Sequence, residues 1–438
     1  MKQFDTRNYK IKHEILKKVI DCSYMDKPEK CYSDISDFTE EITEGNYSSC
    51  CIYKEQAVIH EHMRMMLGGD KNDKNIIEII KPVCDDCHSG GYFITDSCRN
   101  CLSHKCEKVC RNEAISFEIS GRAVINIKKC SECGKCIDAC QFKAIVSLKR
   151  PCENACESRA ISIDDKKNAV ISPDKCISCG QCIKSCPGGA IEEKSYIYDA
   201  VQIIKRSSRV YAIVVPVISA HYSHCKSAQY VNALKECGFK DAVLLNEKIT
   251  DSFDLQAGEM VDSGLCINNF CPSFVNYLNL NFSGVAGNIT RVPSPVIAAA
   301  SDIKRNDKNA QVILISPCTS MKKEFIGNNL IDCVITFQEA DALMDFKGIN
   351  PSDMPCSENN EPDNDQYSQY IENKRLDELF ENIVQQKGFS NLRYRTNICS
   401  GFDECRTVLL KNSRKISANA FICGFICAGG CKNGSGCI

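Results

Sequence analysis

The sequence predicts three parts of different fold class: a short helical N-terminal segment (residues 1–80), an α+β region of cysteine-rich repeats (81–200) and a C-terminal α/β domain (201–438). Three observations predict this division. Charged helical patterns fill the chain before Asp70, cysteines recur at short regular spacings in the middle part, and short apolar runs alternate with helical patterns after Pro187. The length of 438 residues agrees, because domains of about 150 residues predict roughly three.

Helical periodicity in the first part is clearest over residues 9–21 and 55–67. The N-terminus lacks the apolar core of a secretion signal, and the longest apolar run, residues 210–220, is interrupted by Pro216 and too short to cross a bilayer. We therefore expect a cytoplasmic protein without a membrane partner. The net charge of −2, from 54 basic and 56 acidic residues, gives no reason to expect nucleic acid as a partner.

The chain contains 33 cysteines, and sixteen of them lie between Val83 and Pro187. A long chain without an export signal keeps its thiols reduced, and reduced cysteines in groups typically bind metal. So many thiols also favour an anaerobic or strongly reducing cell, because exposed thiols oxidise.

Two cysteine runs in this region share one spacing: Cys130-x2-Cys133-x2-Cys136-x3-Cys140 and Cys176-x2-Cys179-x2-Cys182-x3-Cys186-Pro187. This is the bacterial ferredoxin spacing, in which three cysteines hold one [4Fe–4S] cubane and the fourth reaches a second one. Zinc favours two separated Cys-x2-Cys pairs instead. We therefore expect ferredoxin-like repeats that bind [4Fe–4S] clusters.

The half-motif Cys98-x2-Cys101-x4-Cys106-x3-Cys110 lies upstream of the first run and is its partner. Cys152-x3-Cys156 supplies the last two cysteines of a half-motif that is the partner of the second run. The crossing rule then assigns three cubanes. Their ligand sets are Cys98, Cys101, Cys106 and Cys140; Cys130, Cys133, Cys136 and Cys110; and Cys176, Cys179, Cys182 and Cys156.

Cys152 and Cys186 are left without a Cys-x2-Cys pair, and Cys84-x2-Cys87 is the one pair left over. We expect these four to hold a fourth cubane. Two alternatives stay open for Cys84 and Cys87: spare surface thiols, or part of a small zinc site.

In the C-terminal domain, short apolar runs predict buried strands at 210–219, 242–245 and 312–316. Helical spacing predicts helices at 229–237, 297–304 and 376–386, and a polar composition predicts a loop at 351–366. Alternating strands and helices predict a parallel sheet, at whose strand ends ligands gather.

Three segments of this domain resemble, in order, the active-site signatures of [FeFe]-hydrogenases. They are Asn269-Phe270-Cys271-Pro272-Ser273, Ser316-Pro317-Cys318-Thr319-Ser320 and Cys427-Ala428-Gly429-Gly430-Cys431-Lys432-Asn433-Gly434. Cys50-Cys51-Ile52-Tyr53-Lys54-Glu55, the ferredoxin-type repeats and Ser400-Gly401-Phe402-Asp403-Glu404-Cys405 are similar to a ferredoxin-fused, non-prototypical branch of that family.

The resemblance implies a hydrogenase-like α/β catalytic domain with a fifth cubane held by Cys271, Cys318, Cys427 and Cys431. In the family, one cysteine bridges that cubane to a diiron unit with CO and cyanide ligands, and Cys431 matches this position. Glu324 matches an acidic residue six positions after the second ligand.

Several positions depart from the family pattern. Phe270 replaces a proton-transferring cysteine, and Met321 replaces a lysine that hydrogen-bonds a cyanide, with Lys322 one residue late. Phe425 or Ile426, and Cys423, replace a methionine and an acidic residue, and a Gly-Gly-Val segment is not evident near residues 351–370.

The resemblance implies reversible formation of hydrogen from two protons and two electrons at a cubane–diiron centre, fed by the four ferredoxin-type clusters. The redox partner is expected to be a ferredoxin or another electron-transfer protein. Three functions stay open: a hydrogenase, slow where the proton donor is missing; a non-catalytic electron carrier or a sensor of redox state or hydrogen; and a cluster scaffold without diiron.

Overall fold

The computed structural model describes residues 7–33, 35–44, 51–85, 87, 91–222, 225–355, 376–389, 393–414 and 419–437. Cys50 and most of the predicted loop at 351–366 lie outside these ranges. The same holds for most of residues 351–370, where no Gly-Gly-Val segment is evident. No helix within them has the length and apolar character to cross a bilayer.

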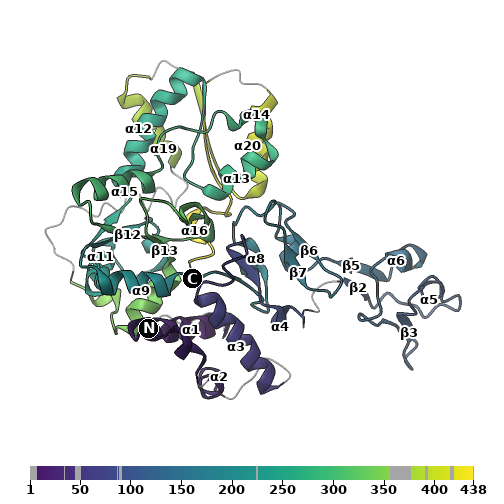
Figure 1. Ribbon diagram of the computed structural model, residues 1–438. Helices are drawn as coiled ribbons and strands as arrows, with labels where there is room; N and C mark the ends of the chain where they lie inside the picture. Colours follow the sequence, from purple (N-terminus) through teal and green to yellow (C-terminus); the bar gives the residue numbers. More distant parts are fainter. Residues whose placement is uncertain are drawn as a thin grey trace.

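The N-terminal segment is helical, as its periodicity predicts. It contains α1 (Arg7–Tyr24), a 3-10 turn η1 (Pro28–Tyr32), α2 (Ile35–Thr43) and α3 (Ile52–Met66). Ile15, Leu16, Val19 and Ile20 form one buried face of α1, at the spacing of helical turns. This face packs against helices of the C-terminal domain, so the N-terminal segment forms the base of that domain (Figure 1).

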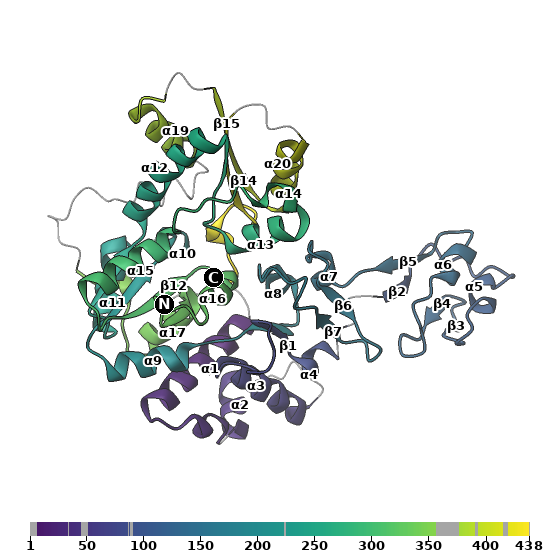
Figure 2. The ribbon, with the colours of Figure 1, turned by 45° about the horizontal axis from the view of Figure 1, so that its top comes forward.

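The cysteine-rich region forms an arm that extends away from the rest of the molecule in each view (Figure 1, Figure 2). Its elements are short: β1 (Ile77–Ile79), α4 (Lys81–Cys84), β2 (Gly91–Ile94), α5 (Lys105–Lys108), β3 (Ile115–Phe117), β4 (Ala123–Ile125), α6 (Lys135–Ala139), β5 (Ile145–Leu148), α7 (Pro151–Asn154), β6 (Ile161–Ile163), β7 (Ala169–Ile171), α8 (Gln181–Ser185) and β8 (Ile191–Glu193).

Four antiparallel strand pairs order the arm: β1 with β8, β2 with β5, β3 with β4, and β6 with β7. We call residues 91–148, enclosed by the β2–β5 pair, the distal lobe. Residues 77–87 together with 150–193, enclosed by the β1–β8 pair, are the proximal lobe. β1 lies just before the predicted boundary at residue 80 and belongs by its pairing to the arm.

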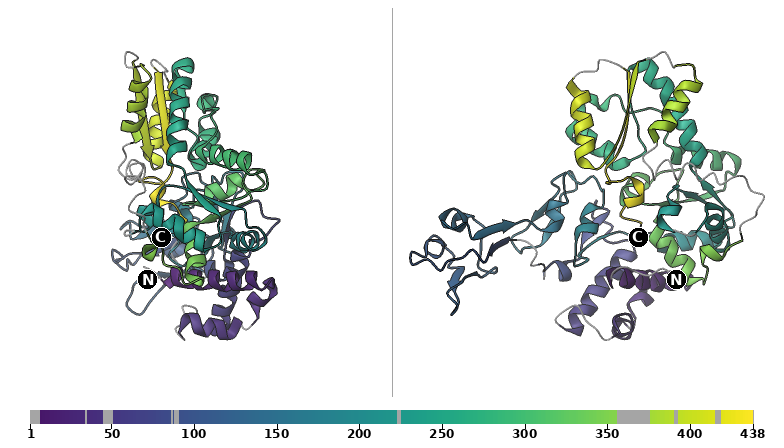
Figure 3. Two further views of the ribbon diagram at one scale, coloured as in Figure 1. Left: turned by 90° about the vertical axis from the view of Figure 1, so that its left-hand side faces the viewer. Right: turned by 180° about the vertical axis from the view of Figure 1, so that it is seen from behind.

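The C-terminal domain contains two parallel sheets. One has the order β10-β9-β12-β13, from β9 (Val210–Val214), β10 (Asp241–Leu244), β12 (Gln311–Ser316) and β13 (Cys333–Thr336). The other has the order β11-β15-β14, from β11 (Leu265–Ile267), β14 (Tyr394–Ser400) and β15 (Asn419–Phe425). Two lobes result, one above the other in the side view (Figure 3).

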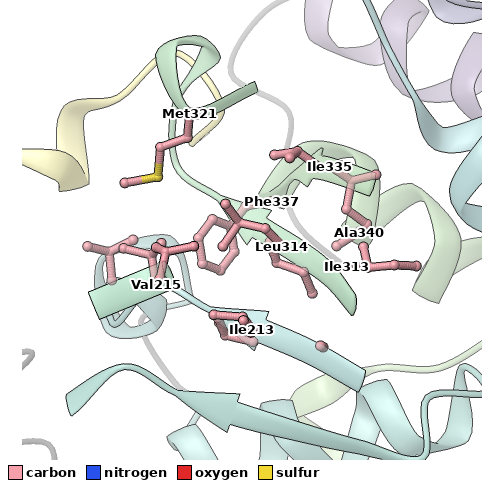
Figure 4. Packing of buried hydrophobic residues seen from close by; sticks show 14 of the residues in the cluster. Ile213, Val215, Ile313, Leu314, Met321, Ile335, Phe337 and Ala340 are labelled. Atoms are coloured by element: carbon pink, nitrogen blue, oxygen red, sulfur yellow. The ribbon is translucent and has the colours of Figure 1, made fainter. Parts of the chain in front are cut away.

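Helices connect and cover these strands. They are α9 (Ile197–Arg206), α10 (Ile218–His221), α11 (Ser227–Glu236), α12 (Asn246–Ser263), α13 (Pro272–Asn281), α14 (Ser283–Ala286), α15 (Pro295–Asn306), α16 (Thr319–Phe325), α17 (Phe337–Phe346), α19 (Leu376–Gln386) and α20 (Phe402–Arg414), with 3-10 turns η2 (Pro351–Asp353) and η3 (Cys431–Asn433). The core of the first sheet is aliphatic and aromatic, and it includes Ile213, Leu314 and Phe337 (Figure 4).

One predicted strand is shorter than expected. The apolar run from Val210 ends as a strand at Val214, and Ile218–His221 forms a helix instead of the end of the predicted strand. Pro216 explains the difference, because it has no N–H to continue the ladder. The second sheet was not predicted from the sequence.

Candidate functional site

The arm repeats one local structure four times. In each repeat a cysteine Sγ accepts a hydrogen bond from the backbone N–H of an alanine four residues later, at 3.2–3.4 Å. The residue before each alanine has a positive φ, which turns that N–H back toward the sulfur. The pairs are Cys110–Ala114, Cys140–Ala144, Cys156–Ala160 and Cys186–Ala190. N–H donors directed at sulfur stabilise thiolate charge, which cluster ligands require.

The structure brings together members of both distal cysteine sets. Burial and then the nearby Cys140 and Cys101 raise the pKa of Cys106. Burial and the nearby thiols of Cys130 and Cys133 likewise raise the pKa of Cys136. Cys98 and Cys110 belong to the small apolar cluster that includes Cys136, so the loops of both sets meet inside the distal lobe.

The third set lies in the proximal lobe. Burial raises the pKa of Cys182 to about 12, with Cys176 and Cys156 as its nearest thiol neighbours. The thiols of Cys176 and Cys156 also neighbour Cys179, and burial strongly raises the pKa of Cys179. Cys156 therefore lies close to the second cysteine run, where the crossing rule places it.

The fourth set joins positions that are a hundred residues apart in sequence. Burial raises the pKa of Cys152 to about 11, and Cys186, Cys84 and Cys87 are its neighbouring thiols. Cys84 is buried, so it is not a surface thiol, and its Sγ accepts from Ala169 N–H at 3.3 Å and from Arg150 Nη1 at 3.7 Å. A cubane at this set, with zinc as the alternative, stays a prediction.

Four cysteines of the C-terminal domain meet between its two sheets. Cys271 follows β11 and precedes α13, Cys318 follows β12 and precedes α16, and Cys427 and Cys431 follow β15. Burial raises the pKa of Cys271 to about 12, with Cys318 as the nearest thiol. Cys431 has all three others as neighbours. Carboxyl ends of parallel strands thus deliver all four thiols.

The proximal lobe contacts this site directly. Cys179 is among the thiols that neighbour Cys427, and Gln181 Nε2 donates to Cys427 Sγ at 3.5 Å. Gly180 lies between them with φ +73°, and a Cβ there would collide with the Ser435 side chain. The third set and the C-terminal set are therefore close, and sequence reasoning had missed Gln181 as a link between them.

A small cavity of about 40 Å³, partly open to solvent, lies beside Cys431. Its walls are mainly apolar. They comprise Val215, Pro216, Leu245, Ile249, Phe270, Ser294, Pro295, Val296, Met321, Glu324, Phe325, Leu376 and Phe425. The Phe270 ring stacks on Phe253 with centroids 5.2 Å apart, and the Met321 side chain lies near Val215 (Figure 4).

Lys322 does not replace the missing lysine. Its side chain is fully buried, with Nζ 2.7 Å from Glu339 and 3.7 Å from Glu193, and it does not line the cavity. Burial would lower the pKa of Lys322, but the two carboxylates hold it above the ordinary value. The pattern Thr336-x-x-Glu339 predicts a capping box that places Glu339 at the start of α17. It does not predict the contact of Glu339 with Lys322.

Glu324, the matched acidic residue, lines the cavity. The residue is exposed on one side, and the loss of solvent around its carboxyl raises the pKa to about 7. Among the lining residues, Glu324 carries the carboxyl group of the cavity wall.

These donors fit cubanes better than a diiron unit. Four thiols at each set are the usual ligands of a [4Fe–4S] cluster. In the part of the chain described, no three or more His, Cys, Asp or Glu side chains converge as ligands of a single metal ion. The cavity beside Cys431 is small, and its lining residues Phe270 and Met321 offer neither a proton donor nor a cation to a diiron unit.

Two family models match the chain. Residues 208–371 match "Iron only hydrogenase large subunit, C-terminal domain", and residues 146–197 match "LdpA Fe-S cluster-binding domain". The second match lies within the proximal lobe and its exit to α9, and supports iron–sulfur cofactors there. No curated protein matches the chain.

Similar solved structures include three [FeFe]-hydrogenases. One, studied for oxygen inactivation of its H cluster 2Fe subcluster, is 13% identical, covering 55% of this chain and 84% of that one (TM-score 0.43). HydA(deltaEFG), from work on stepwise H-cluster assembly, is 14% identical over 52% and 80% (TM-score 0.41). A HydA1 variant from Chlamydomonas reinhardtii is 13% identical over 52% and 80% (TM-score 0.39).

Proposed function

From the match of residues 208–371 to the iron-only hydrogenase model, we propose that this chain is a member of that family and an iron–sulfur redox protein for electron transfer or redox sensing. Four cubanes in the arm relay electrons to or from a fifth cubane at Cys271, Cys318, Cys427 and Cys431. Rapid hydrogen turnover is not its role.

One observation carries the proposal: the third cysteine set abuts the C-terminal set. Cys179 and Gln181 of the proximal lobe neighbour Cys427, so a cluster on each side would be separated by little protein. Such proximity favours one-electron exchange, which is the chemistry that a bound cubane supplies.

The chain's own groups support a buried cubane. Backbone N–H groups of Phe274 and Ile426 point at Cys271 and lower the energy of its thiolate. Those of Ser320 and Met321 do the same for Cys318. The side chains beside the site are mainly apolar, and the proton-transfer position occupied by Phe270 holds no titratable group.

Hydrogen chemistry is the second candidate function, and the cavity beside Cys431 favours it. This cavity, of about 40 Å³, lies where the resemblance places a diiron unit. Cys431 would hold that unit, which supplies the site of proton reduction when bound. Glu324 would hold or release a proton at the cavity wall.

Infrared spectroscopy and iron analysis distinguish the two functions. The protein is produced anaerobically together with hydrogenase maturation proteins. We expect about 20 irons per chain, four for each of five cubanes, reduction of these clusters by dithionite, and no iron-bound CO or cyanide bands. CO and cyanide bands together with hydrogen evolution would replace the proposal by the second candidate. Clusters that leave for an added apo-protein would indicate a scaffold.

A further inference from the structure

A second, larger cleft lies between α3 and the proximal lobe. Its volume is about 990 Å³, at the upper end of the range of small-molecule sites, which is about 300–1,000 Å³. Three stretches of chain line it: α3, residues 70–82 with β1 and the start of α4, and residues 164–171 with β7. The helices α3 and α4 lie side by side at this place (Figure 1, Figure 2).

Negative charge dominates the polar part of this cleft. Five Asp and Glu side chains line it, against two Lys and Arg side chains. Arg64, one of these two, is already paired, with Glu61 at 3.0 Å and with Glu78 at 2.9 Å. Three of the carboxylates form no ion pair with any residue that the structure describes: Asp70, Asp73 and Asp164. The cleft therefore attracts cations.

Two turns in the wall of the cleft present the same pair of groups. In the first, Asp73 Oδ1 accepts the backbone N–H of Asn75 at 2.8 Å. In the second, Asp164 Oδ1 accepts the backbone N–H of Asn168 at 2.7 Å. Asn75 Nδ2 donates to Ile171 C=O at 3.2 Å, so the first turn contacts the strand that follows the second. Each turn thus places a carboxylate and a carboxamide in the wall of one cleft.

The two asparagine side chains carry acceptors that the protein leaves unused. Asn75 is 6% exposed and Asn168 is 7% exposed, and Oδ1 of each has no hydrogen-bond partner among the described residues. A buried acceptor without a donor is costly, so such a group in the wall of a cleft points to a donor from outside the chain. The cleft therefore matches a ligand that carries both positive charge and N–H donors.

We propose that this cleft binds an aliphatic polyamine, a chain of methylene groups that carries two or more ammonium groups. An ammonium group has N–H donors and no acceptor, which matches a wall with unused acceptors. Seven of the lining residues are apolar, among them Ile77, Ile79 and Val170, and they provide contacts for the methylene groups. Binding needs no cluster chemistry, so the site does not depend on the proposed electron relay.

Two other kinds of cation fit the cleft less well. A metal ion needs ligands that converge, and within the described residues no three His, Cys, Asp or Glu side chains do so. A basic peptide brings a backbone C=O with every residue, and these acceptors would face carboxylates and amide oxygens instead of donors. A polyamine meets neither obstacle.

Isothermal titration calorimetry of the anaerobic holoprotein at physiological ionic strength tests the proposal. The probes are spermidine, butylamine with its single ammonium group, magnesium chloride and a tetralysine peptide. The cleft variant is D73N/D164N, which keeps an Oδ1 acceptor for each turn and removes the charge. The control, D262N/D403N, makes the same change at exposed carboxylates of the C-terminal domain. We expect one spermidine per chain, bound at least about tenfold more weakly by the cleft variant and less than about twofold more weakly by the control.

The other outcomes overturn the proposal. No saturable binding of spermidine, or equal affinity of the two variants, would remove the cleft as its site. Butylamine or magnesium that binds as tightly as spermidine would show attraction of charge alone. Tetralysine that binds where spermidine does not would assign the cleft to a basic peptide.

Iron content shows whether the double variant is folded. If its iron content falls, D73N and D164N are compared singly, and each should weaken spermidine binding at least about threefold. An unchanged affinity in both single variants would equally refute the site.

Discussion

The ammonium group of Lys322 lies 2.7 Å from a carboxylate oxygen of Glu339 inside the protein, where both side chains are almost wholly buried. Lys322 belongs to α16, the helix that begins directly after Cys318. The ion pair therefore holds the helix whose first residues surround a proposed cluster ligand. Ser195 also donates to Glu339, which ties the end of the arm to the same carboxylate.

Lys322→Met should destabilise the protein by about 3–5 kcal/mol, because it leaves the buried carboxylate without its cation. The double variant K322M/E339Q should recover part of that loss. Denaturant unfolding of the anaerobic holoprotein measures both. Equal stability of the wild type and K322M would show that the pair contributes nothing.

The same pair predicts a pH dependence. Burial opposes ionisation of Glu339, but Lys322 holds the pKa of Glu339 below its ordinary 4.5, so its contribution is present above that value and is lost in acid. The pKa of Lys322 is held above 10.5, so the contribution is lost only at higher pH. The stability difference between the wild type and K322M/E339Q, which lacks both titrating groups, should be constant from pH 6 to about pH 9. A difference that changes across this range would contradict the assignment.

Glu324 should titrate near neutrality, because reduced solvation raises the pKa of its carboxyl to about 7. The folded state then favours the protonated form, and its stability relative to Glu324→Gln should fall as pH rises from about 4.5 through 7. Infrared difference spectra should show a protonated carboxyl band that disappears with a midpoint near pH 7 and is absent in E324Q. A band that is lost by pH 5 would refute the raised pKa.

Cys152→Ala should remove one cluster of about four irons. Cys237→Ala is the matched control, because Cys237 is also buried but belongs to none of the five sets. Iron and zinc analysis of both variants gives the result. Loss of zinc instead of iron in C152A would assign the Cys84 set to zinc, and an unchanged metal content would remove Cys152 from the ligands.

Arg150→Gln should lower the reduction potential of the cluster proposed at Cys84, Cys87, Cys152 and Cys186. The buried guanidinium donates to Cys84 Sγ at 3.7 Å, and a cation there favours the reduced, more negative cluster. The expected shift is on the order of 50–100 mV, from a charge a few ångströms away at an effective dielectric of about 20. A redox titration followed by electron paramagnetic resonance measures it, and an unchanged potential would place the cluster elsewhere.

Phe270→Cys restores a thiol to the cavity wall and removes the ring that stacks on Phe253, at a cost of about 2 kcal/mol in stability. Phe270→Ser opens the same space without a thiol of comparable acidity. If a diiron unit is loaded, F270C should evolve hydrogen faster than both F270S and the wild type. No gain in a protein that shows CO and cyanide bands would mean that proton supply at this position is not limiting.

The cysteine spacings of the arm grouped thiols that lie near one another, because each motif is local in sequence, whereas their role as cluster ligands stays a prediction. Even the Cys84 pair, assigned because Cys152 and Cys186 lacked partners, lies beside those two residues. Strands with long apolar runs, such as β12, were also predictable, since a buried parallel strand is continuously apolar.

Other features depend on tertiary structure and could not be read from the chain. β11 has three residues and acquires its identity only by pairing with β15. His221 is buried and lies 2.7 Å from Asp341, a contact that no local sequence pattern indicates. The direction of Lys322 follows from carboxylates on β8 and α17, which no local pattern connects with it.

The base of the distal lobe has a further consequence. Ile94 pairs with Ile145, and Thr95 N–H donates to Ala144 C=O at 2.8 Å, so the chain enters and leaves this lobe at adjacent points. A segment whose ends adjoin can be gained or deleted as a cassette. The length of the arm is therefore adjustable by insertion or deletion of this lobe, while the rest of the chain keeps its structure.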